Sequence, residues 1–360
     1  MKGKYMTVSG IQNNNEFVAR IKALGTVMLI ISLWTLCIGG CSHNDPLFQG
    51  EEGAKLQAWN YTRLLYDGKY NDLWDNSTTT FKLTYGNVEN FTAYAQIFLD
   101  QLGEETQVVD ERVFSVQGAW VYERAASFQN LEIPASIEWA LDGDLKITWF
   151  DCRLLPDEAS NQFEDYRTKT DLRMPFDSEW LVLWGGRSIR DNYHAATPNQ
   201  RFAYDFLITQ NGLHYSGDGS RNEDYYCFGE PIVAPGAGVV LDSESNVPDS
   251  LPGEENWDQP YGNYILIDHE NGEYSALMHF RQGTVAVHAG DRVTAGTFLG
   301  QCGNSGVSGI PHLHYHIQNT PDFRDNMGAA GIPVQFQSYS ADGEFVDRGE
   351  PTRWQLVQPQ

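Results

Sequence analysis

Three histidines alternate with other residues near the C-terminal end of the chain, in the segment "HLHYH". They are His312, His314 and His316, three of the nine histidines in the chain. Successive side chains of a β-strand point to opposite faces, so this spacing places the three rings on one face. The preceding stretch, residues 303–311, is rich in glycine and serine and predicts a loop leading into that strand. Neutral imidazole is the commonest metal ligand, so the pattern favours a metal site over a histidine-rich surface strand.

Other residues suited to metal chemistry lie upstream of this segment. His279 ends a strand-like stretch, "YSALMHF", and His194 and Asp205 fall in "NYHAATPNQRFAYDF". Asp205 stands between Tyr204 and Phe206, where burying an unpaired carboxylate would be costly. A catalytic zinc site takes three protein ligands, commonly histidines and a carboxylate, and keeps one position for water. These residues together predict a site for one zinc ion.

The stretch from about residue 180 to 335 resembles the lysostaphin/LytM-type zinc endopeptidases, which cut peptide cross-links of bacterial cell walls. The run "VHAGDRVTAGTFLGQCGNSGVSGIPHLHYHI" carries the most specific part of the resemblance, and "EPIVAPGAGVV" and "GNYILIDHENGEYSALMHF" precede it in the family's order. The resemblance implies that Asp205 and His314 are zinc ligands. It also implies that His279 and His312 are catalytic residues that flank the attacking water and the developing oxyanion.

The chain departs from the family pattern at the first metal ligand. The family has His-x-x-x-Asp, whereas the residue four positions before Asp205 is Arg201, which cannot lose its proton and so cannot bind a metal. We expect His194 to be the third ligand, with a loop inserted between it and Asp205. Such an insertion is tolerable because doubling a loop's length costs only about 0.6 kcal/mol. His214, in "GLHYSGDG", is the alternative third ligand.

Four more histidines receive no ligand role. His316 matches no family position, and the sequence leaves three interpretations open: it orients His314 from the same strand face, it faces the substrate, or it lies exposed at a strand edge. His43 lies in a linker-like segment, and His269 and His288 lie in turn-like segments. All three are predicted to be surface residues.

The composition limits the partners of the chain. Its 360 residues contain 48 acidic and 24 basic residues, for a net charge of −24. Such a charge repels nucleic acid and anionic lipid surfaces, so no nucleic-acid partner is expected. A hydrophobic content of 41% and an aromatic content of 13% are typical of folded domains, and the length leaves room for two.

The N-terminal 40 residues have the features of an export signal. Basic residues precede an apolar stretch of about 16 residues, which is short for a membrane span. The stretch ends in "IGGC", which resembles a bacterial lipobox, so residues 1–40 are predicted to be a lipoprotein signal peptide. The resemblance implies membrane attachment through lipid on Cys41. The protein is then expected at the periplasmic face of the outer membrane in a Gram-negative cell, and otherwise at the outer face of the cell membrane. An uncleaved signal anchor is the alternative.

The rest of the chain divides into two predicted domains. After a linker at residues 41–53, residues 54–157 show helical spacing followed by short strands, which predicts an α+β domain. In pattern it resembles the nuclear-transport-factor-two-like cone; it has no catalytic constellation, and we expect it to fold separately and to be dispensable for chemistry. A polar linker at residues 158–177 precedes residues 178–360, whose glycine-punctuated strands predict a mainly antiparallel β metallopeptidase domain with an open groove.

These features predict a zinc-dependent endopeptidase that hydrolyses peptide cross-links of bacterial peptidoglycan with a metal-activated water. Peptidoglycan peptides are its expected partners. The alternative is a catalytically inactive lysostaphin-type regulatory protein that binds cell wall or activates an amidase. A cupin would also use His-x-His, but it needs a glutamate shortly afterwards, and "YHIQNTPD" contains none.

Overall fold

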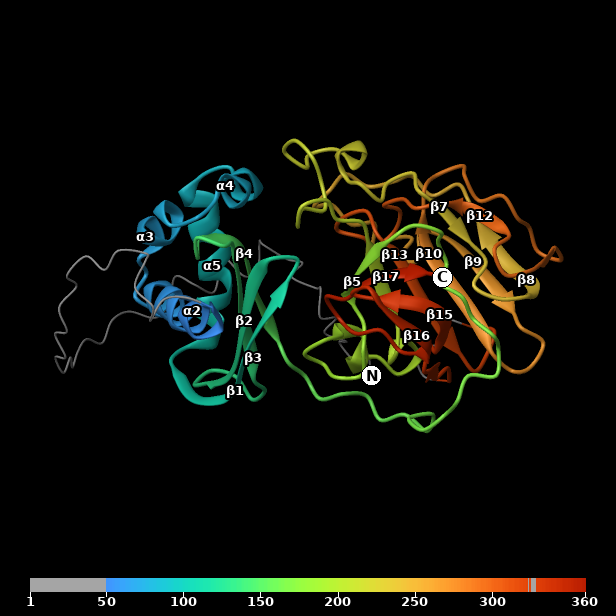
Figure 1. Cartoon of the computed structure of the whole chain (residues 1–360), viewed down its shortest axis with the longest axis horizontal. Coiled ribbons are helices and arrows are strands. Elements are labelled where there is room, and N and C mark those ends of the chain that lie inside the picture. The colour runs from blue at the N-terminus through green and yellow to red at the C-terminus, as the bar shows by residue number, and fades with distance from the viewer. Residues whose placement is uncertain (1–49, 323, 325–327) are drawn as a thin grey trace.

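The computed structural model describes residues 50–322, 324 and 328–360. The predicted signal peptide, Cys41 and His43 lie outside this range. Within the described residues, no helix has the length and apolar character needed to span a membrane. Figure 1 shows two regions side by side, which we call the N-terminal region (residues 50–157) and the C-terminal region (residues 158–360).

The N-terminal region consists of helices followed by an antiparallel sheet, as the sequence predicts. The helices are α2 (Gly50–Tyr66), α3 (Tyr70–Asp75), α4 (Thr79–Tyr85) and α5 (Val88–Leu102). The strands β1 (Glu105–Val116), β2 (Ala119–Phe128), β3 (Ala135–Leu141) and β4 (Ile147–Leu154) pair in sequence order. Helix α5 begins after Asn87, whose side-chain oxygen accepts a hydrogen bond from the backbone N–H of Asn90. It ends at Gly103, whose φ of 69° suits glycine.

The helices cover one face of this four-stranded sheet, and the other face is turned towards the C-terminal region (Figure 1). Between helices and sheet lies a core in which Tyr61, Phe91 and Trp139 are fully buried. This arrangement confirms an α+β fold. The likeness to a nuclear-transport-factor-two-like cone stays a prediction.

The C-terminal region is mainly antiparallel β, as predicted. Its strands are β5 (Trp180–Trp184), β6 (Tyr204–Leu207), β7 (Pro231–Val233), β8 (Gly238–Glu244), β9 (Asn263–Asp268), β10 (Tyr274–Phe280), β11 (Arg292–Val293), β12 (Phe298–Gln301), β13 (Leu313–Gln318), β14 (Gly331–Ile332), β15 (Phe336–Ala341), β16 (Glu344–Gly349) and β17 (Leu356–Pro359). The large sheet has the order β11-β8-β9-β10-β13-β6-β5-β17-β15-β16, with β14 on β13, and β7 pairs with β12 separately. Strand β13 therefore lies at the centre of the sheet.

Strand β13 has buried side chains on both faces. Leu313, Tyr315 and Ile317 point into the main hydrophobic core of the region. The alternate residues of the strand, His314 and His316, face the other side and are buried as well. The two-residue periodicity thus separates the core from the histidines, as the sequence predicts.

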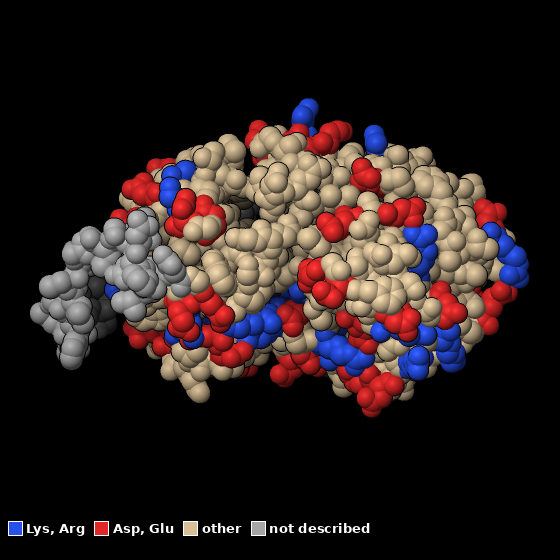
Figure 2. All heavy atoms as spheres, viewed as in Figure 1, with Lys and Arg blue, Asp and Glu red and all other residues tan. Residues whose placement is uncertain are grey.

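The segment predicted as a linker, residues 158–177, runs along the C-terminal region and contributes to it. Leu172, Met174 and Phe176 are almost fully buried in the same core as the strands of the large sheet. Cys152, Cys227 and Cys302 are unpaired and buried. Figure 2 shows acidic side chains spread over both regions on the face in view, in keeping with the net charge of −24.

Candidate metal centre

Three side chains converge at the centre of the large sheet: His194, Asp205 and His314. Their potential ligand atoms all lie within 4.8 Å of one another. Asp205 Oδ2 is 3.0 Å from His194 Nε2, and Asp205 Oδ1 is 2.9 Å from His314 Nδ1. All three residues are buried. Two imidazoles and one carboxylate are a donor set that zinc prefers, so the residues present fit a zinc ion with a fourth position for water.

Strand pairing places two of these residues directly opposite each other. Strand β6 pairs with β13 in a register that sets Asp205 across from His314. Directly opposed residues of an antiparallel pair have close side chains, so these two ligands meet because of the sheet itself. Asp205 therefore has the hydrogen-bonding partners that a carboxylate between two aromatic residues requires.

His194 comes from outside the sheet, in the short helical turn η3 (Tyr193–Ala196). Asn192, fully buried, fixes this turn: its side-chain amide donates to the carbonyls of Gly186 and Ala203, each at 3.0 Å. The Asn192 side-chain oxygen also accepts from the backbone N–H of His194 at 3.2 Å. The inserted loop is thus tied at both ends, and it delivers His194 to Asp205.

A chain of hydrogen bonds along β13 sets the orientation of the His314 ring. The Gln318 amide nitrogen donates to the Thr320 carbonyl at 2.7 Å, so its oxygen faces His316 Nε2, 3.2 Å away, and accepts from it. His316 Nδ1 then accepts from His314 Nε2 at 3.0 Å. His314 Nδ1 is left to bind the metal. The prediction that His316 lies exposed at a strand edge is wrong, because the residue is only 1% exposed.

Replacing His316 by phenylalanine should weaken zinc binding. The change keeps a ring of similar size but leaves His314 Nε2 without its buried acceptor, which costs free energy and frees the ring to turn. Loss of such an outer partner typically costs about 10–100-fold in metal affinity. Competition with a chromophoric chelator measures the change, with the exposed His288→Phe variant as control. Equal zinc affinity of the two variants would contradict the role given to His316.

His279 and His312 flank the three potential ligands. The two rings are 4.9 Å apart between centroids, and His312 Nε2 lies 3.6 Å from Asp205 Oδ1. His279 has a φ of 67°, in the left-handed region that non-glycine residues rarely occupy, and it sits at an irregularity between β9 and β10. Bulges of this kind re-aim side chains, and such strain is commonest at functional sites.

The remaining ring nitrogens of this pair are directed by carbonyl groups. His279 Nδ1 donates to the Ser305 carbonyl at 2.7 Å, and His312 Nδ1 donates to the Ile310 carbonyl at 2.8 Å. A carbonyl only accepts, so each neutral ring carries its proton on Nδ1. Both Nε2 atoms are therefore available to accept a proton.

Burial and mutual charges set the protonation of the cluster. Burial alone would raise the pKa of Asp205, but His194, His312 and the hydrogen bonds to Asp205 hold that pKa well below its usual value. Burial lowers the pKa of His314 to about 4, against a smaller opposing effect of Asp205. Burial, with a further contribution from His312, lowers the pKa of His279 well below its usual value. At neutral pH, Asp205 is ionised and His314 is neutral, as metal binding requires.

The other residues considered as ligands lie away from this cluster. His214 is half-buried, with its ring 4.8 Å from that of Tyr215, and it does not belong to the cluster. Arg201 is buried and pairs with Glu158 and Glu164.

Two surface predictions for histidines have different outcomes. His288 is exposed, as predicted: its side chain is 84% exposed. The prediction for His269 is wrong. That ring is buried because it bonds to the Ala237 carbonyl and the Ser275 hydroxyl, both at 2.7 Å. Turn-like residues around a histidine do not reveal such partners.

Tyr193 is a site residue that the sequence does not predict. Its hydroxyl donates to Asp205 Oδ2 at 3.3 Å, and its ring centroid lies 3.9 Å from that of His194. Tyr193 thus contacts two of the three potential ligands. Its position next to His194 in the chain was the available signal, but nothing in the sequence fixes the direction of its ring.

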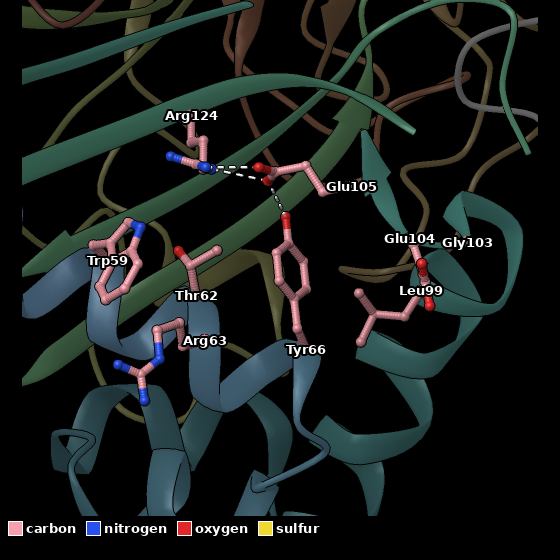
Figure 3. Close-up of a pocket in the computed structure, with 9 residues that line it drawn as sticks. All are labelled: Trp59, Thr62, Arg63, Tyr66, Leu99, Gly103, Glu104, Glu105 and Arg124. Carbon is pink, nitrogen blue, oxygen red and sulfur yellow. Dashed lines mark hydrogen bonds and ion pairs between the residues drawn. The ribbon is translucent and has the colours of Figure 1, made fainter. Parts of the chain in front are cut away.

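The N-terminal region contains a separate cavity of about 440 Å³. Figure 3 shows its lining, in which Tyr66 and Arg124 both bond to Glu105. None of the predicted catalytic or metal-binding residues lines it.

A segment of the C-terminal region matches the model of a known family. Residues 223–326 match the model of Peptidase family M23. The match includes His279, His312 and His314, and it begins downstream of His194 and Asp205. His194, which we expect to be the displaced first ligand, therefore lies outside the part of the chain that the M23 model matches.

Curated relatives match this chain over segments of similar length. An uncharacterized metalloprotease of Buchnera aphidicola subsp. Baizongia pistaciae is 33% identical over 89 residues, 25% of this chain and 20% of that protein. The peptidoglycan DD-endopeptidase ShyC of Vibrio cholerae is 35% identical over 98 residues, 27% of this chain and 19% of that protein. The matched segments span about a fifth of these relatives' lengths. This part of the chain is similar to M23 peptidases.

Among solved structures, the catalytic domain of lysostaphin from Staphylococcus simulans is similar to part of the chain. It is 20% identical, and the likeness covers 42% of this chain and 86% of that domain. The TM-score is 0.26, which is too low to support an argument.

Proposed function

We propose that the protein is a zinc endopeptidase that hydrolyses peptide cross-links of bacterial peptidoglycan. The observation that carries the proposal is the buried His194–Asp205–His314 cluster with two further histidines beside it. The M23 match and the relationship to a peptidoglycan DD-endopeptidase support the substrate class. His194 Nε2, an Asp205 carboxylate oxygen and His314 Nδ1 would hold one zinc ion. The substrate would lie in an open groove over these residues.

When bound, zinc acidifies a water molecule and polarises the scissile carbonyl group. His312 takes the proton of the attacking water on Nε2, because its Nδ1–H is held by the Ile310 carbonyl. The protonated ring then gives this proton to the leaving amine nitrogen. His279, held in the same tautomer by the Ser305 carbonyl, presents an unprotonated Nε2 beside His312 and can share the work of accepting the water's proton.

Digestion of purified peptidoglycan sacculi tests this function. The purified protein should release peptides that the zinc-free protein does not release, and mass spectrometry of the products should identify the bond cleaved. An Asp205→Asn variant, which weakens one metal ligand, is the matched control. Stoichiometric zinc binding without release of any peptide would contradict the enzyme and favour the inactive regulatory alternative.

We also propose that the protein is an exported lipoprotein, which agrees with a cell-wall substrate. Its support is the sequence of residues 1–41, which lies outside the described residues. Mass spectrometry of protein extracted from membranes should find lipid on Cys41 at a new N-terminus. An intact Met1, or cleavage elsewhere with a free Cys41 thiol, would contradict the proposal.

A further inference from the structure

The loop that carries His194 is held by the N-terminal region. Arg112, on β1, donates to Asp191 Oδ1 at 2.7 Å, and Asp191 lies three residues before His194. Arg153, on β4, donates to the backbone carbonyl of Arg190 at 2.6 Å. Both contacts join the N-terminal sheet to the C-terminal region, which lie side by side in Figure 1. One loop thus bears both a proposed metal ligand and the contact points of another region.

Glu123 joins these contacts into one network. Its carboxylate is fully buried on β2 and accepts from Arg112 at 2.6 Å, from Arg153 at 3.2 Å and from Arg190 at 3.2 Å. Arg190 also pairs with Asp110 on β1. A buried carboxylate with three guanidinium partners fixes the positions of all three, because charge-assisted hydrogen bonds are directional and strong. The network therefore sets where the backbone at residues 190–191 lies relative to the N-terminal sheet.

A second set of contacts reaches the same loop through aromatic rings. Arg353 is buried and bonds to Glu138 on β3 at 2.8 and 3.2 Å. Its guanidinium lies 3.9 Å from the ring centroid of Trp184, and Arg153 lies 4.9 Å from that ring. Trp184 in turn packs edge-on against Tyr193, at 5.3 Å between centroids. Tyr193 contacts both His194 and Asp205.

We propose that the N-terminal region is a positioning element of the metal site, with Arg112 acting through Asp191 on His194. The proposal rests on the proposed function, since it assumes that His194 is a ligand. It replaces the expectation from the sequence that residues 54–157 are dispensable for chemistry. The physical reason is that His194 lies on a loop outside the sheet. Contacts with other segments are needed to hold the side chain of such a ligand in place for metal binding.

The test compares two arginine variants of the full-length protein. Arg112→Gln removes the charge that holds Asp191. Arg124→Gln is the matched control: Arg124 is also a partly buried arginine of this sheet, but it pairs with Glu105 and Glu111 and points into the cavity of Figure 3. Both variants should lose some stability of the N-terminal region. Only Arg112→Gln alters a contact with the loop.

Two readouts separate a positioning role from a general loss of structure. In zinc-free protein, amide hydrogen exchange of residues 187–196 should be faster in Arg112→Gln than in Arg124→Gln. Zinc affinity should fall in Arg112→Gln, by at most the roughly 10–100-fold that loss of a direct partner of a metal ligand costs, and stay unchanged in Arg124→Gln. Adding Asp191→Asn should change little in the Arg112→Gln background, because the two residues act through one contact. Arg112→Lys, which keeps the charge, should recover part of the affinity.

The possible failures are distinguishable. Equal exchange of the loop and equal zinc affinity in the two glutamine variants would overturn the positioning role, even with a fully active wild-type enzyme. A wild-type protein that binds no zinc would overturn the proposed function and, with it, the assignment of His194 as the residue being positioned.

Discussion

The His194→Ala variant is expected to be purified without zinc and without hydrolytic activity. The imidazole supplies one of three potential ligand atoms, and it is the only one that comes from outside the sheet. Loss of an outer partner of a metal ligand costs at most about a hundredfold in metal affinity. Removal of the ligand itself should lower the zinc affinity by more than that. Metal analysis of the purified variant, together with chelator competition, measures the effect.

His214→Ala is the control for this variant, because His214 is the alternative ligand in the sequence. Its ring is half-buried against Tyr215 and Tyr225, so the change removes packing and no metal contact. The variant should keep stoichiometric zinc. A zinc-free His214→Ala together with a zinc-loaded His194→Ala would show that the inserted loop has been assigned the wrong role.

The His312→Ala variant should bind zinc nearly as well as the wild type and yet lose most of its activity. His312 lies beside the three ligands without belonging to their cluster. Its Nε2 is free to accept a proton because Nδ1 donates to the Ile310 carbonyl. Loss of general acid–base catalysis typically lowers a rate by about 10²–10⁴-fold. The measurement is kcat/KM for a cross-linked wall peptide, alongside zinc content.

His288→Ala serves as the control for His312→Ala, since the His288 side chain is 84% exposed and has no role in the proposed site. It should match the wild type in zinc content and in rate. If His312→Ala comes out zinc-free, His312 is itself a ligand, and the roles within "HLHYH" must be reassigned.

The sequence predicts the parts of the site that depend on local periodicity. Alternation along β13 places His314 and His316 on one face, and the aromatic neighbours of Asp205 indicate that its carboxylate needs partners. Both inferences rest on strand geometry, which a few residues suffice to determine. The structure adds the register between β6 and β13, which makes Asp205 and His314 direct neighbours.

What the sequence could not show depends on contacts between distant segments. His316 is buried and bonds to the Gln318 side chain, which the Thr320 carbonyl beyond the strand end orients, so spacing alone left its role open. The support of the His194 loop by Arg112 joins residues 79 positions apart. Charged residues along β1 look like an ordinary solvated strand face until the other region packs against them.

Zinc-edge anomalous diffraction from crystals of the full-length protein tests the central claim most directly. We expect one zinc peak within bonding distance of His194 Nε2, an Asp205 carboxylate oxygen and His314 Nδ1, with His312 and His279 beside it and not bound. A peak bound by His214, His312 or His316, or no peak in protein crystallised with zinc, would contradict it.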